Sequence, residues 1–265
     1  MSSILDQIFM HKRQELASTR ALRPAGALMA HIATLPAPLD FAAALRDKTL
    51  LAPRLIAEIK QRSPSRGLLR PDFDPVSLAQ SYALQGAAAI SVLTDERFFG
   101  GSLAILQQIS RLDLGLPLLR KDFLFDPYQL LEARAAGASA VLLIVAMLSE
   151  TQLQELLAAA TELKMTALVE CHTAEEMDRA VAAGAQALGV NNRDLHTFRV
   201  NLETCLQLRP LAPAGTVFVA ESGIHTAEDV RRLARAGVDA MLVGESLVTA
   251  DDPAQKIQDL YALLR

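Results

Sequence analysis

A carboxylate and an amine, Glu58 and Lys60, stand together at the end of the apolar run Leu55-Ile56-Ala57. The run predicts a short buried strand, and alternate residues of a strand share one face, so the two side chains point the same way. A buried Glu or Lys is costly unless it is paired. The pair is therefore either a structural ion pair at a strand end or part of a site that uses both charges.

Five further apolar runs end in polar or glycine-rich residues, which favours a functional site. The clusters at their ends are Arg120-Lys121-Asp122, Glu170, Asn191-Asn192-Arg193-Asp194, Glu221-Ser222-Gly223 and Gly244-Glu245-Ser246. Helix-period segments separate the runs, and strands that alternate with helices predict right-handed βαβ units and a parallel sheet. Polar residues at the carboxyl ends of such strands are typical of the active face of a (β/α)8 barrel.

A repeated Gly-x-x-Ala pattern supports closure into a barrel. Its glycines are Gly86, Gly137, Gly184 and Gly237, which lie 51, 47 and 53 residues apart. Each glycine suits the end of a helix, where a positive φ is needed, and each interval is long enough for two βα units. We predict eight strands, at residues 54–60, 88–93, 117–121, 139–145, 165–170, 186–191, 216–221 and 239–243. A doubly wound open sheet is the alternative, but it would not predict eight evenly spaced units.

The predicted fold is an α/β protein: a single (β/α)8 TIM barrel domain over residues 1–265, with an N-terminal helical extension over residues 1–50. In the extension, Ile4 to Ala17 predicts an amphipathic helix, and prolines from Pro24 onward interrupt the remainder. The extension is too short and too broken to own a core, so we expect it to pack on the barrel.

Helix-start signals agree with this division. Ser149-x-x-Gln152 and Thr173-x-x-Glu176 predict capping boxes, and Asp126-Pro127 predicts a cap followed by a first-turn proline. A final helix is predicted from about Pro253 to Leu264.

Composition excludes several classes of protein. The net charge of −4 argues against a nucleic-acid partner. No apolar run approaches the length of a membrane span, and charged residues interrupt the N-terminus where a signal peptide would be apolar. Cys171 and Cys205 are the only cysteines, and two unpaired thiols favour the cytoplasm.

The five histidines show no metal-ligand spacing, so we predict no metal site. His172 lies two positions after Glu170 and could face the same site, but we interpret it as an ordinary loop histidine.

The predicted cleft holds two amines, Lys60 and Lys121, with several carboxylates and no thiol nucleophile. This set suits proton transfers to and from carbonyl or imine intermediates. A Schiff base on either lysine is the other possibility. Clustered opposite charges shift the pKa of each group, but the sequence does not give the direction.

The last two strands predict a phosphate site. Glu221-Ser222-Gly223 and Gly244-Glu245-Ser246 both lead into helices, and the loops after strands seven and eight bind phosphate in many barrels. Backbone N–H groups at a helix start, with glycine allowing close approach, would bind the anion.

The ordered set of these motifs resembles the indole-3-glycerol phosphate synthase family of tryptophan biosynthesis over essentially the whole chain. The motifs are Glu58-Ile-Lys60-Gln-Arg-Ser63-Pro-Ser65, Leu119-Arg-Lys121-Asp122-Phe123, Leu168-Val-Glu170, Gly189-Val-Asn191-Asn-Arg193-Asp194-Leu195, Ala220-Glu221-Ser222-Gly223-Ile224 and Gly244-Glu245-Ser246-Leu247. Gln61 stands where the family often has a basic residue, which bears on local charge and not on the reaction.

The resemblance implies a cofactor-free lyase that converts 1-(2-carboxyphenylamino)-1-deoxyribulose 5-phosphate to indole-3-glycerol phosphate, carbon dioxide and water. It implies that Lys121 is the general acid of ring closure, that Glu170 and Lys60 serve the dehydration as base and acid, and that Lys60 also contacts the substrate carboxylate. Positioning roles fall to Glu58, Asn191 and Glu221. Phosphate binding falls to Ser63, Gly223, Gly244 and the backbone of Glu245, with Arg193 and Ser222 nearby. Phe99 and Phe123 are expected to wall the aromatic ring.

Three alternatives stand beside the synthase: another phosphate-barrel isomerase of the tryptophan or histidine pathways, a Schiff-base aldolase, and a non-catalytic barrel subunit. The isomerases share the phosphate loops but do not begin with Glu-x-Lys-x-x-Ser-Pro-Ser. We expect a cytoplasmic protein that binds a small phosphorylated substrate, is monomeric, contacts no membrane, and has no second enzyme fused after Arg265. A separate partner enzyme of the pathway is compatible with the sequence.

Overall fold

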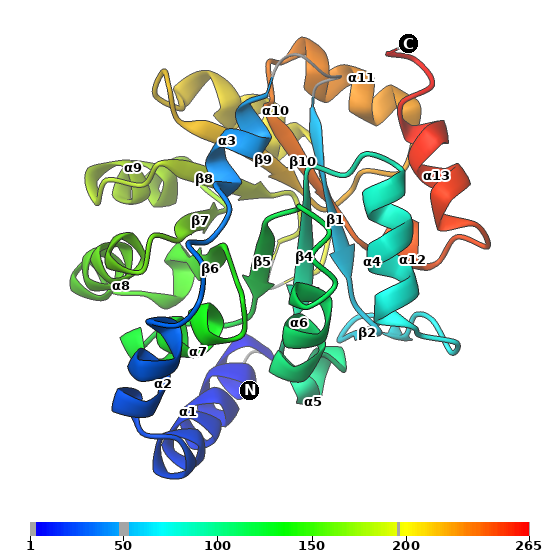
Figure 1. Cartoon of the computed structure of the whole chain (residues 1–265). Helices are drawn as coiled ribbons and strands as arrows, with labels where there is room; N and C mark the ends of the chain where they lie inside the picture. The colour runs from blue at the N-terminus through cyan, green and yellow to red at the C-terminus, as the bar shows by residue number, and fades with distance from the viewer. Residues whose placement is uncertain (1–3, 48–52, 195–196, 265) are drawn as a thin grey trace.

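The computed structural model describes residues 4–47, 53–194 and 197–264, and its centre is a closed barrel of eight parallel strands (Figure 1). Their order around the barrel is β1-β10-β9-β8-β7-β6-β5-β4. Their bounds are β1 Arg54–Ile59, β4 Ala89–Leu93, β5 Leu118–Lys121, β6 Ala140–Ile144, β7 Thr166–Cys171, β8 Ala187–Asn191, β9 Val217–Glu221 and β10 Ala240–Val243. The predicted TIM barrel is confirmed, and the predicted strands match the observed ones to within one residue at each end.

Side chains alternate between the barrel interior and the helix layer, as the two-residue period of a strand requires. The interior is packed with apolar residues that include Ile56, Leu119, Leu142, Leu168, Val219 and Leu242. Residues that point outward form a separate core against the helices. Because register fixes which face a residue occupies, each polar residue two positions beyond an interior apolar residue points into the mouth of the barrel.

Ten helices outside the extension surround the strands in the described part of the chain. They are α4 Pro75–Leu84, α5 Glu96–Phe99, α6 Leu103–Ser110, α7 Pro127–Ala135, α8 Glu150–Glu162, α9 Ala174–Ala182, α10 Glu203–Leu208, α11 Ala227–Arg235, α12 Glu245–Val248 and α13 Pro253–Leu260. The final helix ends four residues before the predicted position. Two 3-10 turns, at Val145–Met147 and Arg209–Leu211, and a small hairpin of β2 Arg62–Ser63 and β3 Gly67–Leu68 complete the loops.

The predicted caps are largely present. Ser149 and Gln152 form the reciprocal capping box of α8, and Asp126 caps α7 ahead of Pro127. The four repeat glycines all have positive φ, between 73° and 94°. The box predicted for α9 is only half formed: Thr173 accepts from the backbone N–H of Glu176, but the Glu176 carboxylate turns to His172 instead.

Three helices precede β1: α1 Ile4–Leu22, α2 Ala25–Ile32 and α3 Phe41–Arg46. The first is longer than predicted, and α2 was not predicted, because Pro24 stands at its N-cap, where proline is tolerated, and does not interrupt it. Figure 1 places α1 and α2 beside α7, and Phe41 and Leu45 of α3 pack against the residues that begin several strands. The extension therefore covers one side of the barrel and closes its amino-terminal end.

A buried ion network joins α1 to the outer face of β5. Lys12, which is only 1% exposed, places its Nζ 3.0 Å from Oδ1 of Asp122. Arg120 and Thr94 also donate to Asp122, at 3.0 and 2.6 Å. Burial alone would raise the pKa of Asp122, but the charges of Lys12 and Arg120 outweigh it and hold this pKa well below its usual range.

No helix within the described ranges combines the length and the apolar character that crossing a membrane requires.

Candidate active site

A cavity opens at the carboxyl ends of the barrel strands, and every site residue predicted from the sequence lines it. From β1 and the loop after it come Glu58, Lys60 and Ser63; from the loop after β4 comes Phe99; from β5 and its loop come Lys121 and Phe123; and from β7 comes Glu170. Asn191 and Arg193 belong to the end of β8 and its loop, and Glu221, Ser222 and Gly223 to the end of β9 and its loop. Gly244 follows β10, and Glu245 begins α12. Strands distant in sequence thus deliver their terminal side chains to one mouth.

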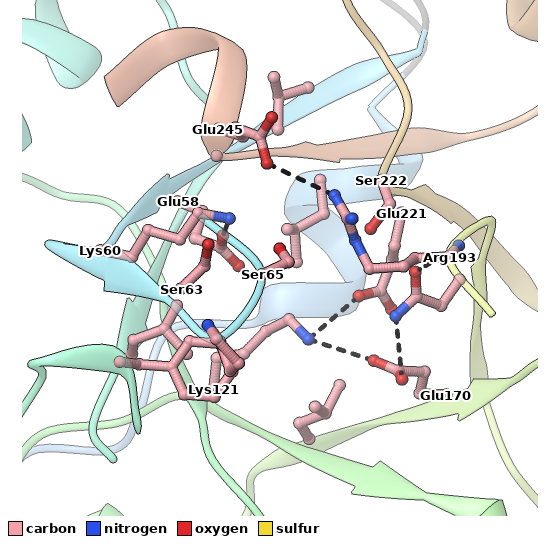
Figure 2. A pocket seen from close by; sticks show the side chains of 18 of the residues that line it. Glu58, Lys60, Ser63, Ser65, Lys121, Glu170, Arg193, Glu221, Ser222 and Glu245 are labelled. Atoms are coloured by element: carbon pink, nitrogen blue, oxygen red, sulfur yellow. Dashed lines mark hydrogen bonds and ion pairs between the residues drawn. The ribbon is translucent and has the colours of Figure 1, made fainter. Parts of the chain in front are cut away.

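Lys121 is the centre of the charged floor (Figure 2). Its Nζ lies 3.1 Å from Oε2 of Glu170 and 3.3 Å from Oε2 of Glu221. Asn191 donates to the other oxygen of Glu170 at 3.2 Å. Glu221 accepts no hydrogen bond from the described residues, so the Lys121 ammonium is its one ionic partner. The Lys121 ammonium is therefore shared between two buried carboxylates.

This arrangement sets the pKa values. Burial lowers the pKa of Lys121, but the charges of Glu170, Glu221 and Glu58 outweigh it and raise this pKa above its usual value. Burial raises the pKa of Glu221 to about 7, and repulsion from Glu170 adds to the rise. Lys121 and His172 hold the pKa of Glu170 below its usual value against the effect of burial. At neutral pH the site thus holds a fully protonated lysine, an ionised Glu170 and a Glu221 close to its midpoint.

Two glycines make room for the carboxylates. A Cβ on Gly244 would clash with Oε1 of Glu58, and a Cβ on Gly189 would clash with Oε1 of Glu221. Each carboxylate therefore lies over a neighbouring strand that lacks a side chain at that point. Glu58 in turn holds Lys60 at 2.6 Å, so the Glu-x-Lys pair is an ion pair that faces the cavity.

The phosphate-type loops lie together at the other side of the mouth. Ser222 and Gly223 both have positive φ, at 65° and 78°. A positive φ is strained for Ser222, which has a side chain, and strained residues of this kind are common at functional sites. The first N–H groups of α12, beginning at Glu245, have no partner within the helix. The hydroxyl of Ser63 is buried and has no hydrogen-bond partner among the described residues.

Glu245 is held by two arginines from separate loops. Arg66 of the β2–β3 turn lies 2.6 Å from its Oε1, and Arg193 lies 3.4 Å from its Oε2. Figure 2 shows the Arg193 guanidinium reaching across the mouth to Glu245. The Glu245 carboxylate is therefore tied to Arg193 of the cavity lining and to the more exposed Arg66.

An apolar wall faces the charged floor. Phe99 and Phe123 lie with their ring centroids 5.9 Å apart, and Leu142 and Ile144 of β6 line the same cavity. A planar aromatic group fits such a wall better than a sugar would. Among the described residues no group of three or more His, Cys, Asp and Glu side chains is placed to hold a metal ion.

Comparison with known families decides what this arrangement is. The profile of the indole-3-glycerol phosphate synthase family matches residues 5–260. The chain belongs to the indole-3-glycerol phosphate synthase family. It is therefore a carboxy-lyase of tryptophan biosynthesis, and the isomerase families are excluded as its family.

Relatives in this family match over almost their full length. The chain is 52% identical to the indole-3-glycerol phosphate synthase of Roseiflexus castenholzii over 98% of both chains, and 48% identical to that of Albidiferax ferrireducens over 99% of both. Among solved structures, the tryptophan synthase alpha subunit of Legionella pneumophila has a TM-score of 0.61 at 17% identity, covering 85% of this chain and 97% of that one. At this identity the likeness shows the barrel fold alone.

Sequence reasoning missed several residues of the synthase cavity. Ile8 of the extension and Phe198 of the loop after β8 both line it, and neither carries a local signal. His172, interpreted from the sequence as a loop histidine, does lie in the loop after β7 and is not among the residues that line the cavity. It is largely buried, however, with its Nε2 3.4 Å from Oε1 of Glu170 and its Nδ1 3.2 Å from Oε2 of Glu176.

Proposed function

We propose that this chain converts 1-(2-carboxyphenylamino)-1-deoxyribulose 5-phosphate to indole-3-glycerol phosphate, carbon dioxide and water. The observation that carries the proposal is the Lys121 ammonium held between Glu170 and Glu221 on the floor of a cavity with an aromatic wall. Family membership supplies the substrate, and the cavity supplies groups suited to each part of it. The protein need supply only proton transfers and binding contacts for this reaction, so no cofactor or metal is part of the proposal.

Lys121 is the proposed general acid of ring closure. The ring carbon that bears the carboxylate attacks the C2 carbonyl carbon, a C–C bond forms, and the carbonyl π electrons move to oxygen. The raised pKa of Lys121 keeps its proton in place at neutral pH, and a developing alkoxide is a stronger base than an amine. An ammonium aimed at that oxygen in a closed cleft stabilises the transition state strongly.

Loss of carbon dioxide then restores the electrons of the C–CO2 bond to the ring system. Lys60 is proposed to bind the substrate carboxylate before this step, and its short ion pair to Glu58 fixes the direction of its ammonium. Dehydration completes the indole: the C2 hydroxyl leaves as water with a proton from Lys60, and Glu170 removes the proton from C1. Asn191, which donates to Glu170, would hold that carboxylate in place.

The phosphate is proposed to bind at the backbone N–H groups near Gly223, Gly244 and Glu245 and at the hydroxyl of Ser63. The unpartnered Ser63 hydroxyl and the open first turn of α12 support this location. Arg193 and Ser222 would lie beside the anion. Phe99 and Phe123 are the proposed walls of the aromatic ring.

We further propose that the protein is one domain that works as a cytoplasmic monomer. The mouth of the barrel draws all of its proposed site residues from one chain, which supports a monomer. Both thiols, Cys171 and Cys205, are buried and unpaired, which suits a reducing compartment. Sedimentation of the purified protein would measure the oligomeric state.

The test of the activity is to mix the purified protein with the carboxyphenylamino substrate and to follow indole fluorescence. We expect turnover without added metal or cofactor. Borohydride added during turnover should trap no covalent adduct, whereas a Schiff-base mechanism would give one on a lysine. Absence of fluorescence from a folded protein would contradict the proposal and favour a non-catalytic barrel.

Sulfate soaked into crystals tests the phosphate site separately. We expect the anion at the backbone near Gly223 and Gly244 and at Ser63. An anion seated consistently elsewhere in the mouth would contradict this assignment.

A further inference from the structure

His172 lies behind Glu170 and outside the cavity, where the proposed reaction gives it no role. It comes directly after the last residue of β7 and is largely buried, and its imidazole stands between two carboxylates. Its Nε2 lies 3.4 Å from Oε1 of Glu170, and its Nδ1 lies 3.2 Å from Oε2 of Glu176. One carboxylate is on the floor of the cavity and the other is on a helix of the outer layer.

The half-formed capping box of α9 is what aims the ring. In a complete box the Glu176 carboxylate would accept from the N–H of Thr173. Here it accepts from the N–H of His172 at 2.7 Å and contacts the Nδ1 of the same residue. The first turn of α9 therefore lacks one capping hydrogen bond. The Glu176 carboxylate instead holds the imidazole of His172, whose Nε2 lies on the side of Glu170.

The two carboxylates favour the charged form of the ring. Nε2 is buried and makes no hydrogen bond among the described residues, so its 3.4 Å contact with Glu170 is a contact between charges. An imidazolium is attracted to both carboxylates, whereas a neutral ring is not. Burial lowers the pKa of His172, but the hydrogen bond to Glu176 and the charges of Glu170, Glu176 and Glu221 outweigh it and raise this pKa.

The other charged groups around Glu170 do not replace the imidazolium. Lys121 of β5 faces the opposite oxygen and is shared with Glu221 of β9. Arg179 of α9 donates to the backbone oxygen of Leu148. His172 is therefore the second cation beside Glu170, and its charge is not shared with Glu221 at contact distance.

We propose that His172 is a positioning residue that, as an imidazolium clamped by Glu176, keeps the Glu170 carboxylate ionised and fixed until it accepts the substrate proton. The role acts through charge and orientation, and no proton passes to the ring. The inference rests on the proposed function, because it assumes Glu170 as the base of dehydration.

The first experiment measures the ring itself and needs no turnover. Nitrogen-15 NMR of the ligand-free protein, with His172 assigned by comparison with His172→Asn, should show an imidazolium at pH 7. In Glu176→Gln the His172 pKa should fall by about one unit, because the negative charge is lost while the amide oxygen can still accept from the ring. A neutral His172 at pH 7 in the wild type would overturn the proposal even if the enzyme is fully active.

The second experiment is the pH profile of kcat for the same variants. Without the imidazolium, only Lys121 and the Asn191 hydrogen bond oppose the effect of burial on the pKa of Glu170. The acidic limb should therefore move to higher pH by about one unit in His172→Asn, and less in Glu176→Gln. Thr173→Ala is the matched control: it removes the N-cap of α9 beside the ring and should lower Tm without moving the limb.

The outcomes separate the two proposals. If wild-type protein makes no indole product, the proposed function fails and the NMR result still decides the state of His172. If turnover is normal and His172→Asn keeps the wild-type limb, or Thr173→Ala moves it as far, the positioning role is wrong. A fall in kcat equal at every pH would indicate a structural role only.

Discussion

The two faces of strand β5 carry two ion clusters whose carboxylates are buried alike but differ in their hydrogen bonds. On the outer face, Asp122 receives bonds from Arg120, Thr94 and its neighbour's backbone, and is paired with Lys12. On the inner face, Glu221 is 1% exposed and has the Lys121 ammonium alone.

The pKa values of Asp122 and Glu221 are shifted in opposite directions as a result. Full hydrogen bonding and two cations hold the pKa of Asp122 far below its usual range, whereas burial and a like charge raise the pKa of Glu221 to about 7. The Asp122 carboxylate accepts at both oxygens and holds α1 against the barrel through Lys12. In the inner cluster the oxygens of Glu221 accept no hydrogen bond from the described residues, and a bound substrate can donate to them. The protonation states of this cluster can therefore change during a reaction.

The largest expected effect comes from Lys121→Met, which removes the ammonium of the inner cluster and keeps much of the stem. The chemical step should slow by at least about 10² if general-acid catalysis contributes its usual share, and the loss should fall mainly on kcat. Steady-state kinetics measures it, with circular dichroism to confirm folding. A variant with near wild-type kcat would show that the proton comes from another group.

Lys12→Met is the matching change in the outer cluster. It leaves Asp122 with less compensation in the protein interior and should cost about 3 kcal/mol of stability, as removal of one partner from a buried pair commonly does. Urea unfolding measures the loss, and kcat of the folded variant should change far less than in Lys121→Met. Comparable losses of kcat in both variants would erase the proposed distinction between the clusters.

Gly244→Ala tests the space that the inner cluster needs. The new Cβ would clash with the carboxylate of Glu58, so Glu58 must move and carry Lys60 with it. We expect a stability loss of about 1–3 kcal/mol from overpacking, together with reduced activity. Gly26→Ala is the control, since a Cβ there meets nothing within 4 Å. Equal behaviour of the two variants would mean that the fit at Gly244 is looser than described.

Glu221→Gln should give the smallest effect, visible as a pH dependence of stability. The pKa of Glu221 rises from 4.5 to about 7 on folding, so between these values the folded protein keeps a proton that the unfolded chain releases. Wild-type stability therefore declines as pH rises through this window, and the variant lacks this decline. The variant should gain about 2.5 kcal/mol relative to wild type between pH 5 and pH 8. A constant difference between the two proteins would argue against the raised pKa.

The sequence predicted the barrel well because strand register carries most of the information. Once an apolar run is recognised as a strand, its last inward residue must face the mouth, so Glu58, Lys121, Glu170 and Glu221 could be brought together without coordinates. The roles proposed for them come from the family resemblance and stay predictions.

Contacts between elements explain what was missed. Lys12 lies between Ile8 and Leu16 on the buried stripe of α1, and a cation there signals a buried partner, but the pattern does not say that the partner is Asp122. Helix α2 was missed because a proline that starts a helix and one that breaks it look the same in sequence. The contact of His172 with Glu170 depends on which backbone N–H the Glu176 carboxylate accepts from. The sequence pattern does not distinguish the N–H of His172 from that of Thr173.

The pairing of each inner carboxylate with a glycine on the next strand has an evolutionary consequence. Glu58 occupies space left by Gly244, and Glu221 occupies space left by Gly189. Within each pair, a larger residue in place of the glycine would clash, and a smaller residue in place of the glutamate would leave a void. Substitutions at the two positions of a pair are therefore expected to be epistatic. A descendant barrel that adopts a new reaction would have to change the acid and its vacant neighbour together, which makes these four positions slow to diverge even where the chemistry tolerates change.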